Sequence, residues 1–388
     1  MRKREFAIVA CGLLVAGCGS GGVAAAPFTQ SAMESAEPLH AYKLLHSFGA
    51  SGDGLQPEAK LIAVNGKLYG TTFGGGKYGS GTVFEITPSG SERVLYSFSG
   101  SGGDGASPEG ALTTAGRVFY GTTVYGGTNG LGTVFSLTTG GKEHVIYSFD
   151  TTRGSKPAAG VLSINRVLYG TTTTGGAKYY GTVFSVSSGK AHVLHAFSGG
   201  KDGSDPHASL IRIGSELYST TQQGGADGFG TVFGITTSGK ERVVYSFRDQ
   251  HDGEFPVAAL IDVRGKLYGT ASVGGSAGCG TVFEVSTSGS EHTIYENFNC
   301  AYDGGTPDGA LVYYKGKFYS TTGSGGHDHY GTAFDVTPAG KFTLLHAFGN
   351  PGDGQTPLAG LVELDGKLYG TTAYGGKLGG GTIFSVAP

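Results

Sequence analysis

Three carboxylates and one histidine occupy the same position in a recurring Asp-Gly-x-x-Pro element, directly after its proline. In chain order that position holds Glu58, Glu109, Ala158, His207, Val257, Asp308 and Leu358. Carboxylates and an imidazole can bind a cation or a polar ligand. The pair Glu58 and Glu109, with His207, could instead perform acid–base chemistry on a glycosidic bond. Solvated charges at a rim are the alternative, so these four side chains are candidate ligand-binding residues.

A second candidate is the run His327, Asp328, His329 and Tyr330, in a loop that contains Gly-Gly. Two histidines and a carboxylate can hold zinc. Alternate residues of an extended segment point to opposite sides, so the two histidines would share a metal only if the loop turned. We therefore predict no metal and no cofactor here. Equivalent loops carry aromatic residues that could stack on sugar rings or pack on neighbouring loops: Tyr78, Tyr125, Tyr179, Tyr180, Phe229 and Tyr374.

The Asp-Gly-x-x-Pro element recurs in six units, and one further unit has Arg153 in place of the aspartate. Its aspartates are Asp53, Asp104, Asp202, Asp252, Asp303 and Asp353. A ring of calcium sites is one interpretation. We favour a local turn, in which the aspartate accepts backbone N–H groups and the glycine takes a positive φ. A function that needs one site seldom requires six copies.

Composition and motifs narrow the class of function. The net charge is −3 and the sequence has no basic stripe, which argues against a nucleic-acid partner. It also has no Gly-x-Ser-x-Gly, no His-Glu-x-x-His and no phosphate loop. The leading hypothesis is a monomeric, non-catalytic binding or scaffold module with a glycan or protein ligand on its loop face. A polysaccharide hydrolase or lyase, and a purely structural surface or adhesion protein, are the alternatives.

The four cysteines divide into two pairs with different predicted fates. Cys11 lies in a short apolar run that follows Arg2, Lys3 and Arg4, and Cys18 ends the tetrad Val-Ala-Gly-Cys. Cys279 and Cys300 remain, at the start of the third and the end of the fourth predicted strand of one unit. Antiparallel pairing brings these ends together, so we predict a disulfide, which persists in an oxidising compartment.

The N-terminus is typical of a targeting segment. Its apolar run is too short for a permanent membrane span, which needs about 20 residues. Residues 1–17 are predicted to be a signal peptide of the bacterial lipoprotein type, with Cys18 as the lipidated residue. The lipid would hold the protein at a membrane of the cell envelope. Gly19 after the cysteine favours the outer membrane, and residues 18–40 read as a flexible tether.

From residue 41 to residue 388 a unit of about 50 residues recurs. Tyr-Gly-Thr-Thr or a close variant begins at Tyr69, Tyr120, Tyr169, Tyr218, Tyr268, Tyr319 and Tyr369. Gly-Thr-Val-Phe or a close variant ends at Phe84, Phe135, Phe184, Phe233, Phe283, Phe334 and Phe384. The 74 glycines, without tryptophan, fit many turns between short aromatic strands.

Each unit contains four short runs rich in β-branched and aromatic residues, which in unit one are 59–64, 67–72, 82–87 and 93–98. The runs are bounded by turn residues and predict four antiparallel strands. The repeat region starts with a lone fourth strand, 42–48, and ends with a third strand, 381–386. A ring closed by pairing these two strands leaves no open edge. We therefore predict an all-β, seven-bladed β-propeller whose N-terminal strand completes the last blade.

This pattern resembles the GloVer tandem repeat, a family with Tyr-Gly-Thr-Thr, Gly-Gly and Gly-Thr-Val-Phe in units of about 50 residues. The resemblance covers residues 41–388 in seven units and implies surface display by one of several anchors. It implies no activity. The period and the glycine pair are more distantly similar to kelch repeats. The lack of tryptophan argues against carrying over the chemistry of kelch, WD-repeat or Asp-box propellers.

Overall fold

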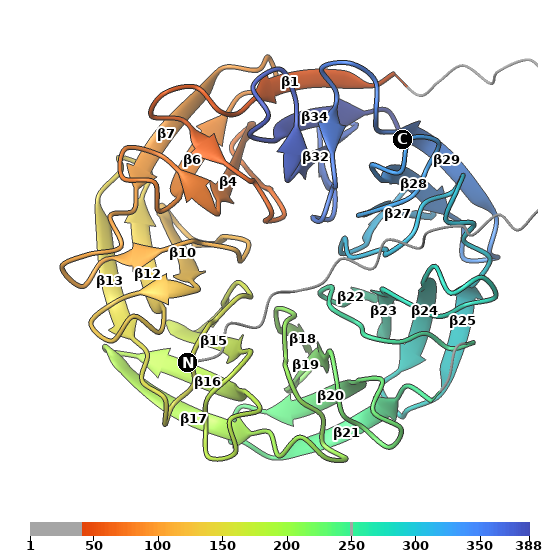
Figure 1. Cartoon of the computed structure of the whole chain (residues 1–388). Helices are drawn as coiled ribbons and strands as arrows, with labels where there is room; N and C mark the ends of the chain where they lie inside the picture. Colours follow the sequence, from red (N-terminus) through yellow and green to blue (C-terminus); the bar gives the residue numbers. More distant parts are fainter. Residues whose placement is uncertain (1–40, 249–250) are drawn as a thin grey trace, which may run out of the picture. The chain divides into compact units, whose positions relative to one another are not determined.

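The computed structural model describes residues 41–248 and 251–388, so the predictions for the signal peptide, Cys18 and the tether lie outside the described residues. Seven four-stranded antiparallel sheets form blades around a central axis (Figure 1). The described residues form strands, turns and loops, and none of their segments is a helix that could cross a membrane. The predicted all-β, seven-bladed propeller is confirmed.

The strands of each blade follow one another outward from the axis. Blades 1 and 2 are β3 (Ile62–Val64), β4 (Lys67–Thr72), β6 (Thr82–Ile86), β7 (Glu92–Ser97), and β9 (Thr113–Ala115), β10 (Val118–Thr123), β12 (Thr133–Thr138), β13 (Glu143–Ser148). Blades 3 and 4 are β14 (Leu162–Ile164), β15 (Val167–Thr172), β16 (Thr182–Ser187), β17 (Lys190–Ala196), and β18 (Ile211–Ile213), β19 (Glu216–Thr221), β20 (Thr231–Thr236), β21 (Glu241–Ser246). Blades 5 and 6 are β22 (Ile261–Val263), β23 (Lys266–Ala271), β24 (Thr281–Ser286), β25 (Glu291–Tyr295), and β26 (Val312–Tyr314), β27 (Lys317–Thr322), β28 (Thr332–Val336), β29 (Phe342–Ala347).

Blade 7 joins the two ends of the described chain. It contains β31 (Val362–Leu364), β32 (Lys367–Thr372), β34 (Thr382–Val386) and, outermost, β1 (Lys43–Ser47). β1 pairs with β34 in an antiparallel register that runs from Lys43 opposite Ser385 to Ser47 opposite Thr382. The predicted ring closure by the N-terminal strand is therefore confirmed.

The hydrophobic core is divided among the interfaces between consecutive blades, which we call seams. The cluster of the 7–1 seam contains Tyr369 and Ile383 of blade 7 with Leu68 and Phe84 of blade 1. Similar clusters fill the other six seams. Blades that pack on both faces explain why their middle strands are almost continuously apolar. The seam at which the ring closes is packed like the rest.

The repeated threonines join neighbouring strands within a blade. The hydroxyls of Thr72 and Thr82 lie 2.8 Å apart, and both side chains are fully buried. The corresponding pair occurs in every blade except the fifth, where Ala271 replaces the first threonine. Two buried hydroxyls that satisfy each other avoid the cost of unpaired polar groups. Tyr-Gly-Thr-Thr and Gly-Thr-Val-Phe therefore recur together.

The strand predictions need two local corrections. In blade 1 the first strand begins at Ile62 rather than residue 59, because residues 59 and 60 line the central cavity and Leu61 packs in the 7–1 seam, all without a strand partner. In the Asp-Gly-x-x-Pro turns the expected positive φ at the glycine is confirmed at Gly203, Gly253 and Gly304, whereas Gly54, Gly105 and Gly354 do not have one. In all seven units the residue before the proline takes the left-handed conformation: Gln56, Ser107, Lys156, Asp205, Phe255, Thr306 and Thr356.

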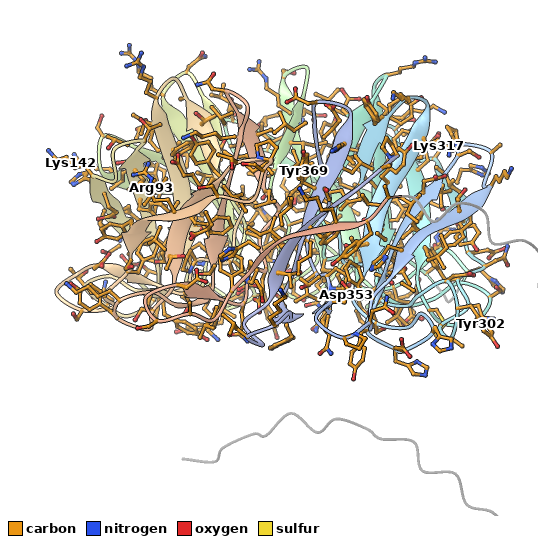
Figure 2. The ribbon with its side chains drawn as sticks, turned by 90° about the horizontal axis from the view of Figure 1, so that it is seen from above. Arg93, Lys142, Tyr302, Lys317, Asp353 and Tyr369 are labelled. Atoms are coloured by element: carbon orange, nitrogen blue, oxygen red, sulfur yellow. A yellow bond between two sulfur atoms is a disulfide. The ribbon has the colours of Figure 1, made fainter. Side chains whose placement is uncertain are left out.

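The Asp-Gly-x-x-Pro connections and the Gly-Gly loops lie together on one face. Small two-stranded sheets pair them: β2 (Gly54–Leu55) with β5 (Gly74–Gly75), β8 (Gly105–Ala106) with β11 (Tyr125–Gly126), and β30 (Gly354–Gln355) with β33 (Tyr374–Gly375). Figure 2 shows Asp353 and Tyr302 toward this face, whereas Lys317 lies toward the other. We call this side the loop face.

A disulfide between Cys279 and Cys300 confirms the predicted pair, with 5.6 Å between the Cα atoms. Both cysteines lie just outside the strands, before β24 and after β25. The bond closes the ends of the outer hairpin of blade 5, which is also the blade without the threonine pair.

Candidate functional site

A cavity of about 350 Å³ opens where the seven blades converge on the axis. Its lining includes the residue after the proline from every blade, so the four predicted residues Glu58, Glu109, His207 and Asp308 share one cavity. These four residues lie on short connections between packed blades. The blades on either side hold the backbone of each connection in place. The structure therefore brings together the four residues that the sequence placed at equivalent positions. Ligand binding by these residues stays a prediction.

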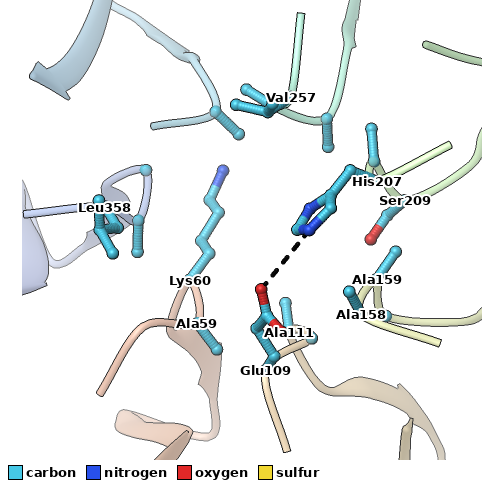
Figure 3. A pocket seen from close by; sticks show the side chains of 18 of the residues that line it. Ala59, Lys60, Glu109, Ala111, Ala158, Ala159, His207, Ser209, Val257 and Leu358 are labelled. Carbon is cyan, nitrogen blue, oxygen red and sulfur yellow. Dashed lines mark ion pairs between the residues drawn. The ribbon is translucent and has the colours of Figure 1, made fainter. Parts of the chain in front are cut away.

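His207 lies between two carboxylates. Its Nε2 atom is 3.7 Å from Oε1 of Glu109, as the dashed line in Figure 3 marks. Burial raises the pKa of Glu109, and the pKa of Asp205 is raised for the same reason, while His207 opposes both shifts. Oδ1 of Asp205 is buried and has no hydrogen-bond partner among the described residues. The group therefore offers carboxyl oxygens that can accept hydrogen bonds.

Glu58 also has an altered acidity in the cavity. Burial, with a contribution from the negative charge of Glu109, raises the pKa of Glu58 to about 7. A carboxyl with this pKa is present in both protonation states near neutral pH, so it can donate or accept a hydrogen bond. That behaviour suits either a polyhydroxyl ligand or general acid–base catalysis.

Asp308 is held by a neighbouring blade. The hydroxyl of Ser272 donates to Oδ1 of Asp308 over 2.5 Å. Burial raises the pKa of Asp308, against the opposing effects of this hydrogen bond and of His207. The serine directly follows β23 of blade 5. Its hydrogen bond therefore holds Asp308 in position across the 5–6 seam.

Lys60 is a candidate site residue that sequence reasoning missed. Its side chain projects into the cavity, facing the side on which Val257 and Leu358 lie (Figure 3). Burial lowers the pKa of Lys60 to about 8, and no ion pair of Lys60 is found in residues 41–248 and 251–388. The sequence did contain a signal for Lys60, which is the third residue after its proline. In the other six units this position holds a small residue: Ala111, Gly160, Ser209, Ala259, Ala310 and Gly360.

The second predicted segment lies apart from the channel mouth. Nδ1 of His327 is 2.9 Å from Oδ1 of Asp328, and the two side chains are 84% and 47% exposed. His329 has a φ of 63°, so the loop does turn at this point. None of His327, Asp328, His329 and Tyr330 lines the channel-mouth cavity. Ligand binding by this segment remains a separate prediction.

Exposed tyrosines occur in the Gly-Gly loops of several units. Tyr179 is 70% exposed and Tyr78 is 54% exposed, and Tyr125, Tyr180, Tyr330 and Tyr374 are also exposed. Phe229 behaves differently, because its ring packs on Phe255 with centroids 6.3 Å apart. Both interpretations of the loop aromatics therefore have support, because most of the rings are exposed to solvent and one packs against a neighbour.

Fold and cavity together define a seven-bladed propeller with a chamber at the mouth of its channel, into which a few ionisable side chains reach among small residues. The model of the Gloeobacter/Verrucomicrobia repeat matches residues 29–217 and 187–384. The chain belongs to this repeat family, as the sequence resemblance predicted.

Comparisons beyond the family give the fold alone. No curated protein matches the chain. A puromycin hydrolase, in the crystal structure of its S511A mutant complexed with PGG, is similar with a TM-score of 0.51 and 12% identity. The match covers 81% of this chain and 50% of the hydrolase, so this chain spans about half the length of that protein. Candidate 6-phosphogluconolactonases of Bacteroides uniformis and Bacteroides fragilis have TM-scores of 0.45 and 0.49 at 14% and 16% identity. Those matches cover 77% and 80% of this chain and 86% and 88% of theirs.

Proposed function

We propose that the chain is a lipoprotein of the bacterial cell envelope, anchored through Cys18, whose propeller binds a glycan without turning it over. The observation that supports this most is the chamber at the channel mouth, where Glu58, Glu109 and Asp308 face an axis shared with Lys60. Carboxyls accept hydrogen bonds from sugar hydroxyls, and a rigid scaffold that carries variable residues is typical of recognition sites.

Size and charge narrow the ligand. A volume of about 350 Å³ is at the small end for ligand sites, so the chamber fits the end of a chain better than a long segment. Lys60 brings an ammonium without an ion pair among the described residues, which favours a sugar that carries a carboxylate. The exposed tyrosines, such as Tyr78 and Tyr179, would then stack on the sugar units that follow.

A glycan array probed with the full chain, followed by calorimetric titration of the strongest binder, tests the proposal. We expect Glu58→Gln with Glu109→Gln to weaken binding about 10-fold or more, since each lost charged hydrogen bond contributes roughly 1.5 kcal/mol. Lys60→Met should weaken uronate-bearing glycans more than neutral ones. The matched control is His327→Ala with His329→Ala, which leaves the chamber intact.

Two outcomes oppose the proposal. An array without any binder would shift support to a protein ligand or to a purely structural surface role. Equal binding by the glutamine variant and the unmodified protein would remove the chamber from the site, and loss of binding in the histidine control would move the site to the sixth loop.

A polysaccharide hydrolase or lyase is the second candidate, and one observation favours it. The pKa of Glu58, raised to about 7 beside the charged Glu109, is what a general acid paired with a second carboxylate requires. Incubation with a polysaccharide panel separates the two candidates. Turnover by the unmodified protein that disappears in Glu58→Gln identifies an enzyme, and binding without turnover in both proteins supports the binding module.

A further inference from the structure

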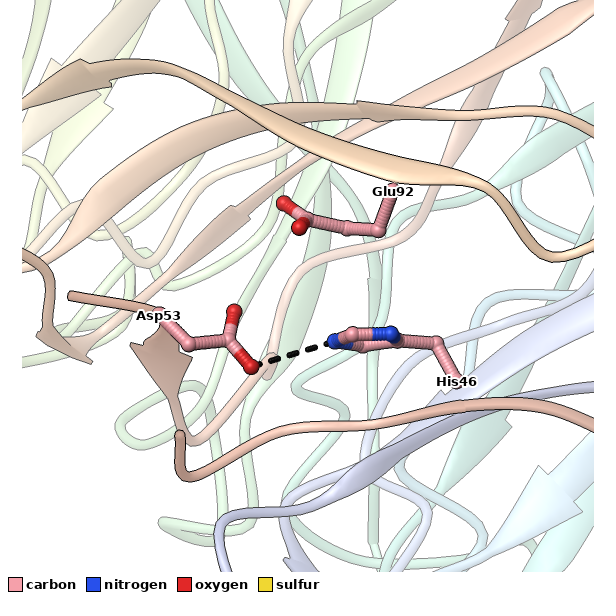
Figure 4. Close-up of side chains that lie close together, drawn as sticks. All are labelled: His46, Asp53 and Glu92. Carbon is pink, nitrogen blue, oxygen red and sulfur yellow. Dashed lines mark hydrogen bonds and ion pairs between the residues drawn. The ribbon is translucent and has the colours of Figure 1, made fainter. Parts of the chain in front are cut away.

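In every seam a side chain on the outermost strand of the earlier blade contacts a neighbouring polar residue. The 7–1 seam differs from the others in the residues that meet there. At the 7–1 seam the participants are His46 of β1, Asp53 of the following connection and Glu92 of β7 (Figure 4). Nε2 of His46 is 3.1 Å from Oδ2 of Asp53. One ligand atom from each of the three residues lies within 4.8 Å of the other two.

Each of the three side chains directs an atom that can bind a metal toward the other two. Oδ1 of Asp53 accepts the backbone N–H of Gly54 over 2.7 Å, which fixes the carboxylate and turns Oδ2 toward the imidazole. Oε1 of Glu92 is buried and has no hydrogen-bond partner within the described residues. No lysine or arginine of the described chain forms an ion pair with Asp53 or Glu92. Two carboxylates thus face an imidazole without a cation to balance them.

We propose that His46, Asp53 and Glu92 bind a divalent transition-metal ion, with Zn²⁺ as the best match. One imidazole nitrogen and two carboxylate oxygens are zinc ligands, and water would complete a four-coordinate site. The imidazole disfavours Ca²⁺ and Mg²⁺, which prefer oxygen ligands. The 2+ charge of the ion would balance the summed 2− charge of the two carboxylates. The N–H group of Gly54 supplies the outer contact that holds a ligating carboxylate in place.

The 1–2 seam shows what the same positions do without a metal. Tyr96 replaces the histidine and donates its hydroxyl to Oδ2 of Asp104 over 3.1 Å. That oxygen also accepts the backbone N–H and the hydroxyl of Ser99, at 2.7 and 2.9 Å. The aspartate oxygen is therefore fully engaged. In the 7–1 seam Gly49 stands where Ser99 stands, so Asp53 receives no such hydroxyl.

The two other seams with a histidine are also less suitable. At the 3–4 seam His195 and Asp202 lie 3.1 Å apart, but both oxygens of Asp202 accept hydrogen bonds from Ser198. At the 6–7 seam Tyr42 takes the position of Glu92, donates to Asp353 and stacks on His346. Only the 7–1 seam, among the described residues, combines three ligand atoms with an aspartate oxygen that contacts the imidazole alone.

The position of the site gives it a consequence for the ring. His46 belongs to the strand that completes blade 7, whereas Glu92 belongs to blade 1. A metal bound by both would hold the closing strand β1, which completes blade 7, against blade 1. Such a link stabilises the folded state, which holds the ligands together, and not the unfolded chain, which does not.

Metal content and thermal unfolding of the untagged full-length protein test the site. After removal of metal with a chelator and dialysis against Zn²⁺, we expect one zinc per chain and a Tm several degrees higher than without metal. His46→Tyr should reduce zinc affinity on the order of 100-fold and abolish the rise in Tm. Tyrosine occupies this position in other blades, as Tyr96 and Tyr245 do, so this variant should fold.

Two matched variants locate the ion. His195→Tyr, in the 3–4 seam, and His327→Ala with His329→Ala, in the sixth loop, should each keep one zinc. With Co²⁺ the spectrum should lack a thiolate charge-transfer band, which excludes Cys11 and Cys18 as ligands. Failure of the unmodified protein to bind zinc overturns the proposal, and so does zinc that survives His46→Tyr or is lost in either control.

Discussion

The seams and the channel mouth are built from the same repeated unit, yet they use it in opposite ways. In the seams the unit repeats its chemistry, so that Phe84 of blade 1 has a counterpart in every blade. At the channel mouth the corresponding positions change from Glu58 to Leu358 around the ring. Packing between identical blades imposes the same shape seven times, whereas side chains that face the cavity are released from that requirement. Repetition therefore marks the scaffold and variation marks the surface available for recognition.

Removing one repeated seam residue should have the largest effect. Phe84 is completely buried and contacts Phe48 of the closing strand, with ring centroids 5.2 Å apart. We expect Phe84→Ala to reduce the free energy of unfolding by about 3–5 kcal/mol, because the site cannot collapse around the cavity. Urea denaturation followed by far-UV circular dichroism measures it. A loss below about 1 kcal/mol would contradict the assignment of this residue to the scaffold.

The disulfide occurs in one blade only, yet we assign it to the scaffold and not to recognition. It therefore tests whether every departure from the repeat serves recognition. Cys279 and Cys300 close a loop with a sequence separation of 21 residues. Loop entropy predicts that Cys279→Ala with Cys300→Ala costs about 3 kcal/mol. Thermal unfolding of the double variant, with the reduced unmodified protein beside it, tests this. Glycan binding at low temperature should stay unchanged, and a loss of binding would mean that this asymmetry serves recognition as well.

The smallest expected effect concerns the channel mouth and depends on pH. The pKa of Glu58 rises from its ordinary value of 4.5 to about 7 on folding, so the folded state holds this proton more tightly than the unfolded chain. Its contribution to stability is complete below pH 4.5, is lost as the pH rises toward 7, and stays lost above.

Glu58→Gln should remove this loss of stability with rising pH, because glutamine does not titrate. Between pH 4.5 and pH 8 the variant should lose about 1 kcal/mol less than the unmodified protein, a modest value because water in the channel screens the charge. Denaturation at a series of pH values gives both curves. Parallel curves would show that Glu58 titrates normally, and the channel mouth would then lack the altered acidity described above.

The sequence was sufficient for the architecture and for part of the site. Seven units in register, the last of which lacks only the fourth strand that the N-terminal end supplies, determine both the blade count and the closure by β1. The residues after the prolines could be grouped because a symmetric ring brings equivalent positions to one axis. Lys60 was missed because it lies two positions further on, among small residues, where the predicted strand did not place it at the channel.

The trio His46, Asp53 and Glu92 could not be predicted in this way. Its members come from three positions of the repeat and from two different blades. Their proximity depends on how far one blade is rotated and shifted against the next, which side-chain packing in the seam determines. The repeat pattern contains no measure of that shift, so only coordinates bring the imidazole within 3.1 Å of the carboxylate.

The closing strand has one further consequence. β1 completes blade 7 through hydrogen bonds to β34, and these bonds are the same whether the two strands belong to one molecule or to two. A molecule whose β1 has detached exposes the edge of β34, which is a template for a strand from another copy. Head-to-tail strand exchange at high protein concentration would then join the rings into linear assemblies.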